Sequence, residues 1–290
     1  MTSRVEPWAI LDIDPERIRR IVRAAIEEDV GERDATTEAT VDAGARATGV
    51  FVAKQSLRVA GLDVALEAFH CVDPHIQWET RAREGDAFEK GHLIASVAGS
   101  ARGILTGERV ALNFLQRMSG IATITRGFVD AVAGTRAKIR DTRKTTPLLR
   151  LLEKRAVLVG GGAPHRSGLD SAILVKDNHV LMAGSVAEAT RRAVAAAGTL
   201  HVEIEVDRPD QIDEALAQGA QMILLDNFTP EAVRSAVGRI AGRVPVEVSG
   251  GIRLETVRAY AEAGPDYIAV GALTHSAPAV DISLEIERSG

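Results

Sequence analysis

Five positions in the second half of the chain place a polar or small residue at or near the end of a short apolar run, and these are Lys176, Glu205, Asp226, Ser249 and Gly271. Each residue type has a chemical use. A lysine can pair with an anion or form a Schiff base, carboxylates hold hard cations, and glycine turns admit phosphate. One such residue alone is more often an ordinary turn residue, but repetition over successive apolar runs favours a single shared site.

A second set of chemical groups is cationic. Arg143 and Lys144 follow an apolar run and precede a helix signal, and their charges beside hydroxyls and helix-start amides predict an anion cradle. His165 and Arg166 follow three glycines at 160–162, where the backbone can approach a ligand or form a mobile surface loop. Ten basic and three acidic residues lie between positions 136 and 176, so this segment carries +7 and the remainder −12, within a net charge of −5.

Some of these residues also have simpler interpretations. Glu205 and Asp226 are spaced for Mg²⁺ held together with substrate phosphates, but they could form structural salt bridges. Lys176 could form a Schiff base, bind an anion or pair with a neighbouring acid. We expect three further cations to lie on a solvated helix face: Arg150, Lys154 and Arg155. The histidines show no H-E-x-x-H or other tight metal spacing, and three are interpreted as ordinary residues of the first domain: His70, His75 and His92.

The apolar runs that carry these residues have the spacing of parallel strands. They lie at residues 137–140, 172–175, 202–206, 222–225, 244–248 and 267–270. They lack strict alternation, and from residue 202 onward they start roughly 20 residues apart. Helix signals lie between them: Pro147 after Thr146, the capping pattern Ser185-x-x-Glu188, Pro209, and Pro230 after Thr229. This cadence predicts a (β/α) barrel or a doubly wound sheet, and polar residues at five strand ends favour the barrel.

The first part of the chain has a different pattern. Asp14 and Pro15 start an amphipathic helix that we expect to end near Asp29 and Gly31. Strand-like stretches lie at residues 50–53, 76–80 and 93–97, with a helix at 62–71 and helical patterns at 103–118 and 121–132. The sequence therefore predicts a separate layer of helices and strands over roughly the first 115 residues, joined to the barrel by helices.

Composition excludes several classes of protein. With 290 residues, 46% hydrophobic and 26% charged, the chain is unlike a disordered protein, a collagen or a coiled coil. A net charge of −5 and a pI near 5.9 argue against nucleic acid as a partner. Cys71 is the single cysteine, which excludes an intrachain disulfide and suits a reducing compartment. Residues 1–10 show no export signal and no run reaches ~18 apolar residues, so we expect a cytoplasmic protein with no membrane partner.

Short motifs along nearly the whole chain carry a family resemblance. They are Glu28-Asp29, Asp34-x-Thr36-Thr37, Gly107-Glu108-Arg109-x-Ala111-Leu112-Asn113, residues 141–147 and 160–166, Lys176-Asp177-Asn178-His179, Glu203-Ile204-Glu205-Val206, Leu225-Asp226-Asn227, Val248-Ser249-Gly250-Gly251 and Thr274-His275-Ser276-Ala277-Pro278. With these motifs the chain resembles the quinolinate phosphoribosyltransferase family, also called nicotinate-nucleotide pyrophosphorylase (carboxylating). The resemblance implies an α/β protein: an open (β/α) barrel catalytic domain at residues 116–277, and an N-terminal α/β sandwich domain at 1–115 that residues 278–290 complete.

The resemblance also implies a reaction in de novo NAD synthesis. Quinolinate and phosphoribosyl pyrophosphate, with Mg²⁺, give nicotinate mononucleotide, pyrophosphate and CO2. It further implies a homodimer or larger assembly in which Arg109 of one subunit reaches into the site of the other.

The same match assigns roles to individual residues. The quinolinate pocket would contain Arg109, Arg143, His165, Arg166 and Lys176. The catalytic set would be Lys144, which faces phosphoribosyl pyrophosphate, together with Glu205 and Asp226, which hold its ribose hydroxyls and the metal. The 5′-phosphate would be held by Ser249, Gly250, Gly251 and Gly271.

Two positions depart from the family pattern. Pro164 stands where an asparagine usually precedes the His-Arg pair, and Ser171 stands where an acid is usual. Pro164 lacks an amide side chain and a backbone N–H, which bears on how His165 and Arg166 are positioned. Three alternatives therefore stay open: a paralogous phosphoribosyltransferase or pyrophosphorylase for another acidic ring, a Schiff-base barrel aldolase using Lys176, and a non-catalytic anion-binding module.

Overall fold

The computed structural model describes residues 14–288, which form two compact units. Within these residues, the first unit comprises 14–126, 146–161 and 276–288, and the second comprises 127–145 and 162–275. Residues 1–10, for which we expect no export signal, lie outside the described residues. No helix in the described part of the chain is both long enough and apolar enough to cross a membrane.

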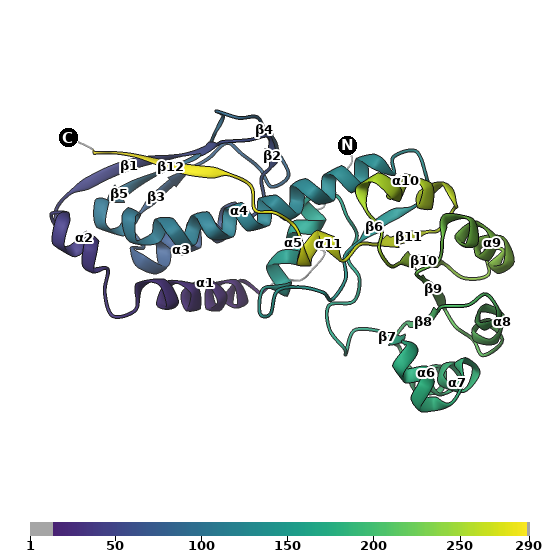
Figure 1. Ribbon diagram of the computed structural model, residues 1–290. Coiled ribbons are helices and arrows are strands. Elements are labelled where there is room, and N and C mark those ends of the chain that lie inside the picture. Colours follow the sequence, from purple (N-terminus) through teal and green to yellow (C-terminus); the bar gives the residue numbers. More distant parts are fainter. Residues whose placement is uncertain (1–13, 289–290) are drawn as a thin grey trace, which may run out of the picture. The chain divides into compact units, whose positions relative to one another are not determined.

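An antiparallel sheet forms the centre of the first unit. Its strands lie in the order β12 (Ile282–Arg288), β1 (Arg46–Ala53), β5 (Leu93–Ser100) and β3 (Gln77–Glu79). Figure 1 shows β12, in yellow, alongside the purple β1, so the end of the described chain completes the sheet. The rings of Phe51, Phe69 and Trp78 meet in the core beside this sheet. A separate two-stranded sheet pairs β2 (Leu57–Arg58) with β4 (Ala87–Phe88).

The first helices follow their sequence signals. The helix α1 (Pro15–Val30) begins after Asp14, whose side chain accepts a hydrogen bond from the Glu16 N–H, and it ends at Gly31, where φ is +59°. Both predicted ends are confirmed. The predicted helix at 62–71 is α3 (Leu62–Val72). A short helix, α2 (Ala35–Thr40), was not predicted.

Two predicted helical segments form one continuous helix, α4 (Ala101–Ala131). Ser119 and Gly120 interrupt the apolar pattern but not the helix. A Cβ at Gly120 would collide with the carbonyl oxygen of Pro278, so the glycine permits another segment to approach closely. Ser119 is buried, and its hydroxyl accepts a hydrogen bond from the Ala60 N–H at 3.0 Å. These small residues therefore mark contacts along the helix rather than its end.

The expectation that α5 (Arg150–Val159) presents its cations to solvent is wrong. Lys154 and Arg155 are only 2% and 3% exposed, while Arg150 has intermediate exposure. Arg155 donates to both carboxylate oxygens of Asp63 at 2.8 Å. A buried cation is tolerated when it is paired, and this partner lies 92 positions away in the sequence. The local charge pattern could not show it.

The start of α5 also differs from its sequence signal. The helix begins at Arg150, three residues after Pro147, where a start was expected. Thr146 does not cap a helix at Pro147, because its N–H and hydroxyl both donate to the buried Glu153, at 3.0 and 2.7 Å. Leu148 has a φ of +67°, which ends any regular helix at this point.

A curved parallel sheet forms the second unit, and all six predicted strands are confirmed. Its strands lie in the order β6 (Lys138–Arg140), β11 (Tyr267–Ala269), β10 (Val246–Ser249), β9 (Met222–Asp226), β8 (Val202–Val206) and β7 (Ile173–Val175). The helices of this unit after β7 are α6 (Asp177–Ala183), α7 (Val186–Ala196), α8 (Asp210–Ala217), α9 (Pro230–Ile240), α10 (Leu254–Glu262) and α11 (Ala272–His275). Figure 1 shows α8 and α9 along the outer side of the curve. In the described residues β6 and β7 are edge strands that do not pair with each other, so the predicted open barrel is confirmed.

The helix starts within the barrel follow the capping signals of the sequence. The Ser185 side chain accepts a hydrogen bond from the Glu188 N–H at 3.1 Å at the start of α7. The Thr229 hydroxyl accepts one from the Ala232 N–H at 3.3 Å before α9, and Pro209 directly precedes α8. These residues fix where each of the three helices begins.

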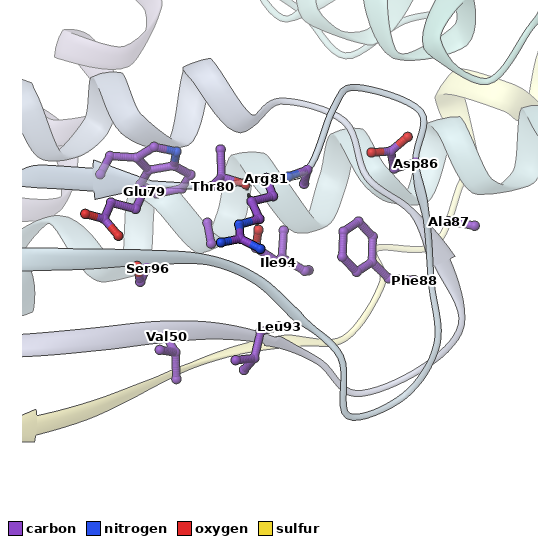
Figure 2. Close-up of a pocket in the computed structure, with 13 residues that line it drawn as sticks. Val50, Glu79, Thr80, Arg81, Asp86, Ala87, Phe88, Leu93, Ile94 and Ser96 are labelled. Atoms are coloured by element: carbon purple, nitrogen blue, oxygen red, sulfur yellow. Dashed lines mark hydrogen bonds between the residues drawn. The ribbon is translucent and has the colours of Figure 1, made fainter.

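A hollow of about 880 Å³ lies in the first unit, between β5 and the segment at residues 79–88 (Figure 2). Phe88 and Leu93 line it, and the dashed line in Figure 2 marks the hydrogen bond from the Thr80 hydroxyl to the Ile94 carbonyl, at 2.7 Å. None of the predicted site residues lines this hollow. The predicted site residues other than Arg109 lie in the second unit.

Candidate active site

The carboxyl ends of the six barrel strands form one rim, because every pair in the sheet is parallel. Asp226 and Ser249 are paired residues at the ends of β9 and β10. Glu205 lies one residue before the end of β8. Lys176 directly follows β7, and one residue separates Gly271 from the end of β11. The sequence prediction that these five residues share one end of the sheet is therefore confirmed.

The two rim carboxylates share an electrostatic environment with two lysines. Lys176 Nζ forms an ion pair with Glu205 Oε2. Burial and then the charge of Glu205 raise the pKa of Asp226, while Lys176 and Lys144 act in the opposite direction. Asp226 also accepts a hydrogen bond from Asn227 Nδ2 at 2.7 Å. Two crowded carboxylates with partial compensation from lysines form a site in which an added cation would be stabilised.

Close-packed glycines follow β10 and β11. Gly250 has a φ of +103°, and a Cβ there would collide with the Asn227 side chain and lie 2.8 Å from its backbone nitrogen. Gly251 is also left-handed, with a φ of +61°. A Cβ at Gly271 would lie 3.2 Å from Lys144 Cδ, so this turn and the lysine side chain lie side by side. Backbone N–H groups in such turns can face an anion without obstruction from side chains.

Two arginines lie near the same rim, because Ala163 forms a parallel bridge with Arg140 and the arginines Arg143 and Arg166 follow three residues after each of these. Burial and then the charge of Arg143 lower the pKa of Arg166. Arg166 Nη1 donates to the carbonyl oxygen of Ala172 at 3.0 Å, which fixes one end of its guanidinium group. An anionic ligand that pairs with both guanidinium groups would be stabilised in this partly buried region.

The side chain of His165 points at two carboxylates. Its Nε2 atom lies 3.2 Å from Glu203 Oε2 and 3.4 Å from Glu247 Oε1, and the side chain is 9% exposed. Burial disfavours its charged form, but hydrogen bonds to Glu203 and Glu247 outweigh this and raise the pKa of His165 to about 9. Burial also raises the pKa of Glu203. The raised pKa of His165 means that the imidazole and the carboxylates it faces share an additional proton at neutral pH.

The raised pKa of His165 predicts that the free energy of unfolding falls between about pH 6.5 and pH 9. The pKa of His165 is raised from 6.5 to about 9, so the stabilisation is complete below 6.5 and is lost as the pH rises through 9. This pKa shift corresponds to about 3 kcal/mol of unfolding free energy. Urea unfolding at about pH 6 and about pH 9.5 measures it, with His165→Gln as the reference that lacks the slope. Wild type and variant with the same pH dependence would contradict the assignment.

Both departures from the family motif have structural partners. The carbonyl oxygen of Pro164 accepts a hydrogen bond from Arg140 Nε at 3.2 Å. The Ser171 hydroxyl accepts hydrogen bonds from the N–H groups of Ser167 and Gly168, at 3.1 and 3.2 Å. Ser171 therefore closes its own loop, and the backbone at Pro164 is held without an amide side chain at that position.

Arg109 lies apart from these residues in the division of the chain. It is an exposed residue of α4 in the first unit, and the other predicted site residues belong to the second unit. Its neighbour Glu108 has a pKa that burial raises and that the charge of Arg109 lowers. The predicted role of Arg109 across a subunit interface therefore stays a prediction.

Sequence reasoning missed the acids that surround His165 and the arginine that pairs with one of them. Glu203 and Glu247 lie two positions before Glu205 and Ser249 on their strands, so they share the inward face one layer below the rim. Arg140 Nη1 donates to Glu247 Oε2 at 2.6 Å, and its guanidinium group lies 4.2 Å from the ring centre of Tyr267. For Glu203 the available signal was a second acid, two positions before Glu205, on an otherwise apolar strand.

Family models match both parts of the chain. The model described as "Quinolinate phosphoribosyl transferase, C-terminal domain" matches residues 121–285, and the corresponding N-terminal domain model matches residues 34–119. The first of these alone covers more than half of the chain.

Full-length relatives give the same result. The chain is 46% identical over 283 residues to the nicotinate-nucleotide pyrophosphorylase [carboxylating] of Mycobacterium leprae, covering 95% of this chain and 99% of that protein. It is 40% identical over 274 residues to the probable enzyme of the same name from Bacillus subtilis, covering 94% of each.

Solved structures extend the similarity to the fold. The structure of NadC from Streptococcus pyogenes superposes with a TM-score of 0.92 at 40% identity, covering 96% of this chain and 99% of that one. The nicotinate-nucleotide pyrophosphorylase of Francisella tularensis gives a TM-score of 0.90 at 36% identity, covering 95% and 98%. On these matches, the chain belongs to the quinolinate phosphoribosyl transferase family.

Proposed function

We propose that this chain transfers the phosphoribosyl group of phosphoribosyl pyrophosphate to quinolinate with decarboxylation, giving nicotinate mononucleotide, pyrophosphate and CO2 in de novo NAD synthesis. The observation that carries the proposal is the rim itself, where two carboxylates, two lysines and glycine turns lie together at the carboxyl ends of the strands, with Arg143 and Arg166 on the same side of the sheet. A pyridine dicarboxylate needs several cations, and a phosphorylated sugar pyrophosphate needs cations, a metal and backbone N–H groups.

The acidic ring is assigned to the arginine side of the rim. Arg143 and Arg166 supply two planar guanidinium groups that can each hold a carboxylate bidentately. Lys176, in contact with Glu205, adds a third cation. His165 borders this region, with its ring turned towards Glu203 and Glu247.

The sugar phosphate is assigned to the glycine side. Lys144, beside Gly271, faces the pyrophosphate, and the 5′-phosphate is held by backbone N–H groups at Ser249, Gly250 and Gly251. The Gly250 turn leaves no room for a side chain, which suits the close approach of a phosphate to the backbone.

Mg²⁺ fits the carboxylate pair between these two regions. Glu205 and Asp226 offer hard oxygen ligands, and burial and then the charge of Glu205 raise the pKa of Asp226, which a bound cation would offset. When bound, Mg²⁺ would stabilise the charge of the departing pyrophosphate. The residues themselves would hold the ribose hydroxyls and keep the anomeric carbon in line with the ring nitrogen.

The reaction then needs no strong base. The ring nitrogen forms a bond to the anomeric carbon as the bond to the pyrophosphate oxygen breaks, and pyrophosphate leaves with the electron pair. The bond between ring carbon 2 and its carboxylate breaks next, CO2 leaves, and the adjacent positive ring nitrogen stabilises the electrons left behind. A proton from solvent completes the product. Lys144 stabilises the leaving group, and the two arginines hold the ring throughout.

A partner subunit completes the proposed site. Arg109 is exposed on α4, and we assign it to the quinolinate pocket of the second subunit in a homodimer or larger assembly.

The single cysteine suits a reducing compartment, and we place the reaction in the cytoplasm, which fractionation of the source cells would test.

Mixing two inactive variants tests the shared site. In a hybrid dimer of Arg109→Ala and Lys144→Ala subunits, one site carries both substitutions and the other carries neither. We therefore expect each hybrid dimer to regain about half of the wild-type activity when the subunits are exchanged. If Arg109 instead serves its own subunit, every site keeps one lesion and mixing restores nothing.

A comparison of acceptor rings tests the proposed substrate. Pyrophosphate release from phosphoribosyl pyrophosphate is expected with quinolinate and to be far slower with nicotinate, because the monocarboxylate leaves one guanidinium group without a partner. Faster release with another acidic ring would favour a paralogous transferase. Trapping of a keto sugar on Lys176 by borohydride, without pyrophosphate release, would favour an aldolase.

A further inference from the structure

A buried charged cluster lies inside the barrel, one layer below the rim, and the proposed reaction gives no role to three of its four members. It consists of Arg140, His165, Glu203 and Glu247. Glu247 is fully buried and Glu203 is 4% exposed. Arg140 contacts Glu247 through one oxygen, and His165 contacts both acids. Charged groups at this depth carry a large desolvation penalty, so their presence calls for an explanation.

A metal ion is a poor occupant of this cluster. The ligand atoms of His165, Glu203 and Glu247 lie within 4.8 Å of one another, a spacing that a divalent metal could use. However, Nδ1 of His165 accepts a hydrogen bond from the Arg166 N–H at 2.7 Å. A neutral ring that accepts this bond carries its proton on Nε2, and a charged ring carries a proton there too, so the atom that would have to bind the metal is protonated in either state. The cluster is built around a proton that Nε2 shares with the two carboxylates.

The same cluster holds the backbone that carries Arg166. Arg140 Nε donates to the carbonyl oxygen of Pro164 at 3.2 Å, and the His165 N–H donates to Asp141 Oδ1 at 2.8 Å. When the ring is neutral, the Arg166 N–H donates to Nδ1 of the imidazole itself. Three successive residues are thus held through side chains of the cluster and its neighbour Asp141. None of these bonds needs an amide side chain at position 164.

We propose that Glu247 is a positioning residue for the acidic-ring site: it fixes Arg140 and His165, and through them the backbone that aims Arg166 at the space beside Arg143. The identity of the ring rests on the proposed function. Glu247 does not reach the substrate, since it is fully buried below the rim. Two guanidinium groups hold two carboxylates only when their separation matches, so a loosened Arg166 weakens binding of the ring. Glu247 lies on β10 two residues before Ser249, but its side chain contacts Arg140 and His165, not Lys144 or the glycine turns that are assigned to phosphoribosyl pyrophosphate.

The variant Glu247→Gln tests this role, because it keeps the shape of the side chain and removes its charge. We expect calorimetry without phosphoribosyl pyrophosphate to show quinolinate binding weakened about tenfold or more, with a matching rise in KM for quinolinate. The KM for phosphoribosyl pyrophosphate should stay within about twofold. The matched control is Glu262→Gln, an exposed acid paired with Arg258 in the same unit, which should change neither value.

A second variant separates positioning from general stability. The double variant Arg140→Gln with Glu247→Gln removes both charges of this buried pair. No unpaired buried charge remains, so the thermal stability lost in Glu247→Gln should largely return. The positioning role predicts that quinolinate binding stays weak in this double variant. Recovery of stability and quinolinate binding together would overturn it, as would an equal loss of affinity for both substrates in Glu247→Gln. Failure of the proposed function would appear elsewhere, as a wild-type protein that forms no product.

Discussion

Replacing Lys144 by alanine is expected to lower kcat by about 10²–10³-fold while leaving the fold intact, because the side chain stabilises the charge of the leaving pyrophosphate. Lys144 is exposed, so its removal leaves no buried group unpaired. Its side chain lies beside Gly271, and its charge acts on Asp226. The Thr274 hydroxyl donates to the Lys144 carbonyl oxygen at 2.7 Å, so the backbone keeps its place when the side chain is removed.

The matched control for this prediction is Lys138→Ala. Lys138 is an exposed lysine of β6 in the same basic segment, but it lies at the start of the strand, away from the rim. Its removal should leave kcat within about twofold of the wild type, since exposed charges far from the site are screened. The proposed residue assignment would not survive unchanged rates in both Lys144→Ala and Arg143→Ala.

Replacing Asp226 by asparagine is expected to reduce kcat by about 100-fold and to raise the Mg²⁺ concentration needed for half-maximal rate, because one of two carboxylate ligands is lost. The same change should leave the melting temperature equal or higher. Burial and Glu205 both disfavour the ionised form of Asp226, so a neutral side chain relieves that repulsion. A loss of activity together with a gain in stability marks a residue kept for function.

Measurement of rate against Mg²⁺ concentration and of thermal unfolding checks this second prediction. Asp210→Asn, at the exposed start of α8 in the same unit, is the control and should change neither the rate nor its metal dependence. A variant at Asp226 that keeps the wild-type Mg²⁺ dependence would remove the carboxylate pair from the metal site. Chelation of Mg²⁺ from the wild type should abolish product in the same assay.

The sequence predicted the barrel well because its signals are local. Each strand is a short apolar run bounded by turn residues, and all six are where the pattern indicates. Capping residues such as Ser185 and Thr229 fix helix starts by hydrogen bonds to N–H groups three residues away. The rim residues follow from the same logic, because parallel strands bring their carboxyl ends to one edge.

The parts that were wrong or missed depend on distant partners. Arg155 is buried because Asp63 reaches it from far along the chain, and no local pattern distinguishes such a cation from a solvated one. Glu203 and Glu247 were missed because their value lies in meeting His165, a loop residue, from two different strands. The effect of Pro164 also depended on a distant residue, Arg140, whose side chain holds its carbonyl oxygen.

The most direct test of the proposed reaction uses quinolinate labelled at the 2-carboxylate, with unlabelled phosphoribosyl pyrophosphate and Mg²⁺. We predict one labelled CO2 for each nicotinate mononucleotide formed, and neither product when any of the three components is left out. A nucleotide product that forms without release of the label, or a folded protein that forms neither product with all three present, would contradict the proposed reaction.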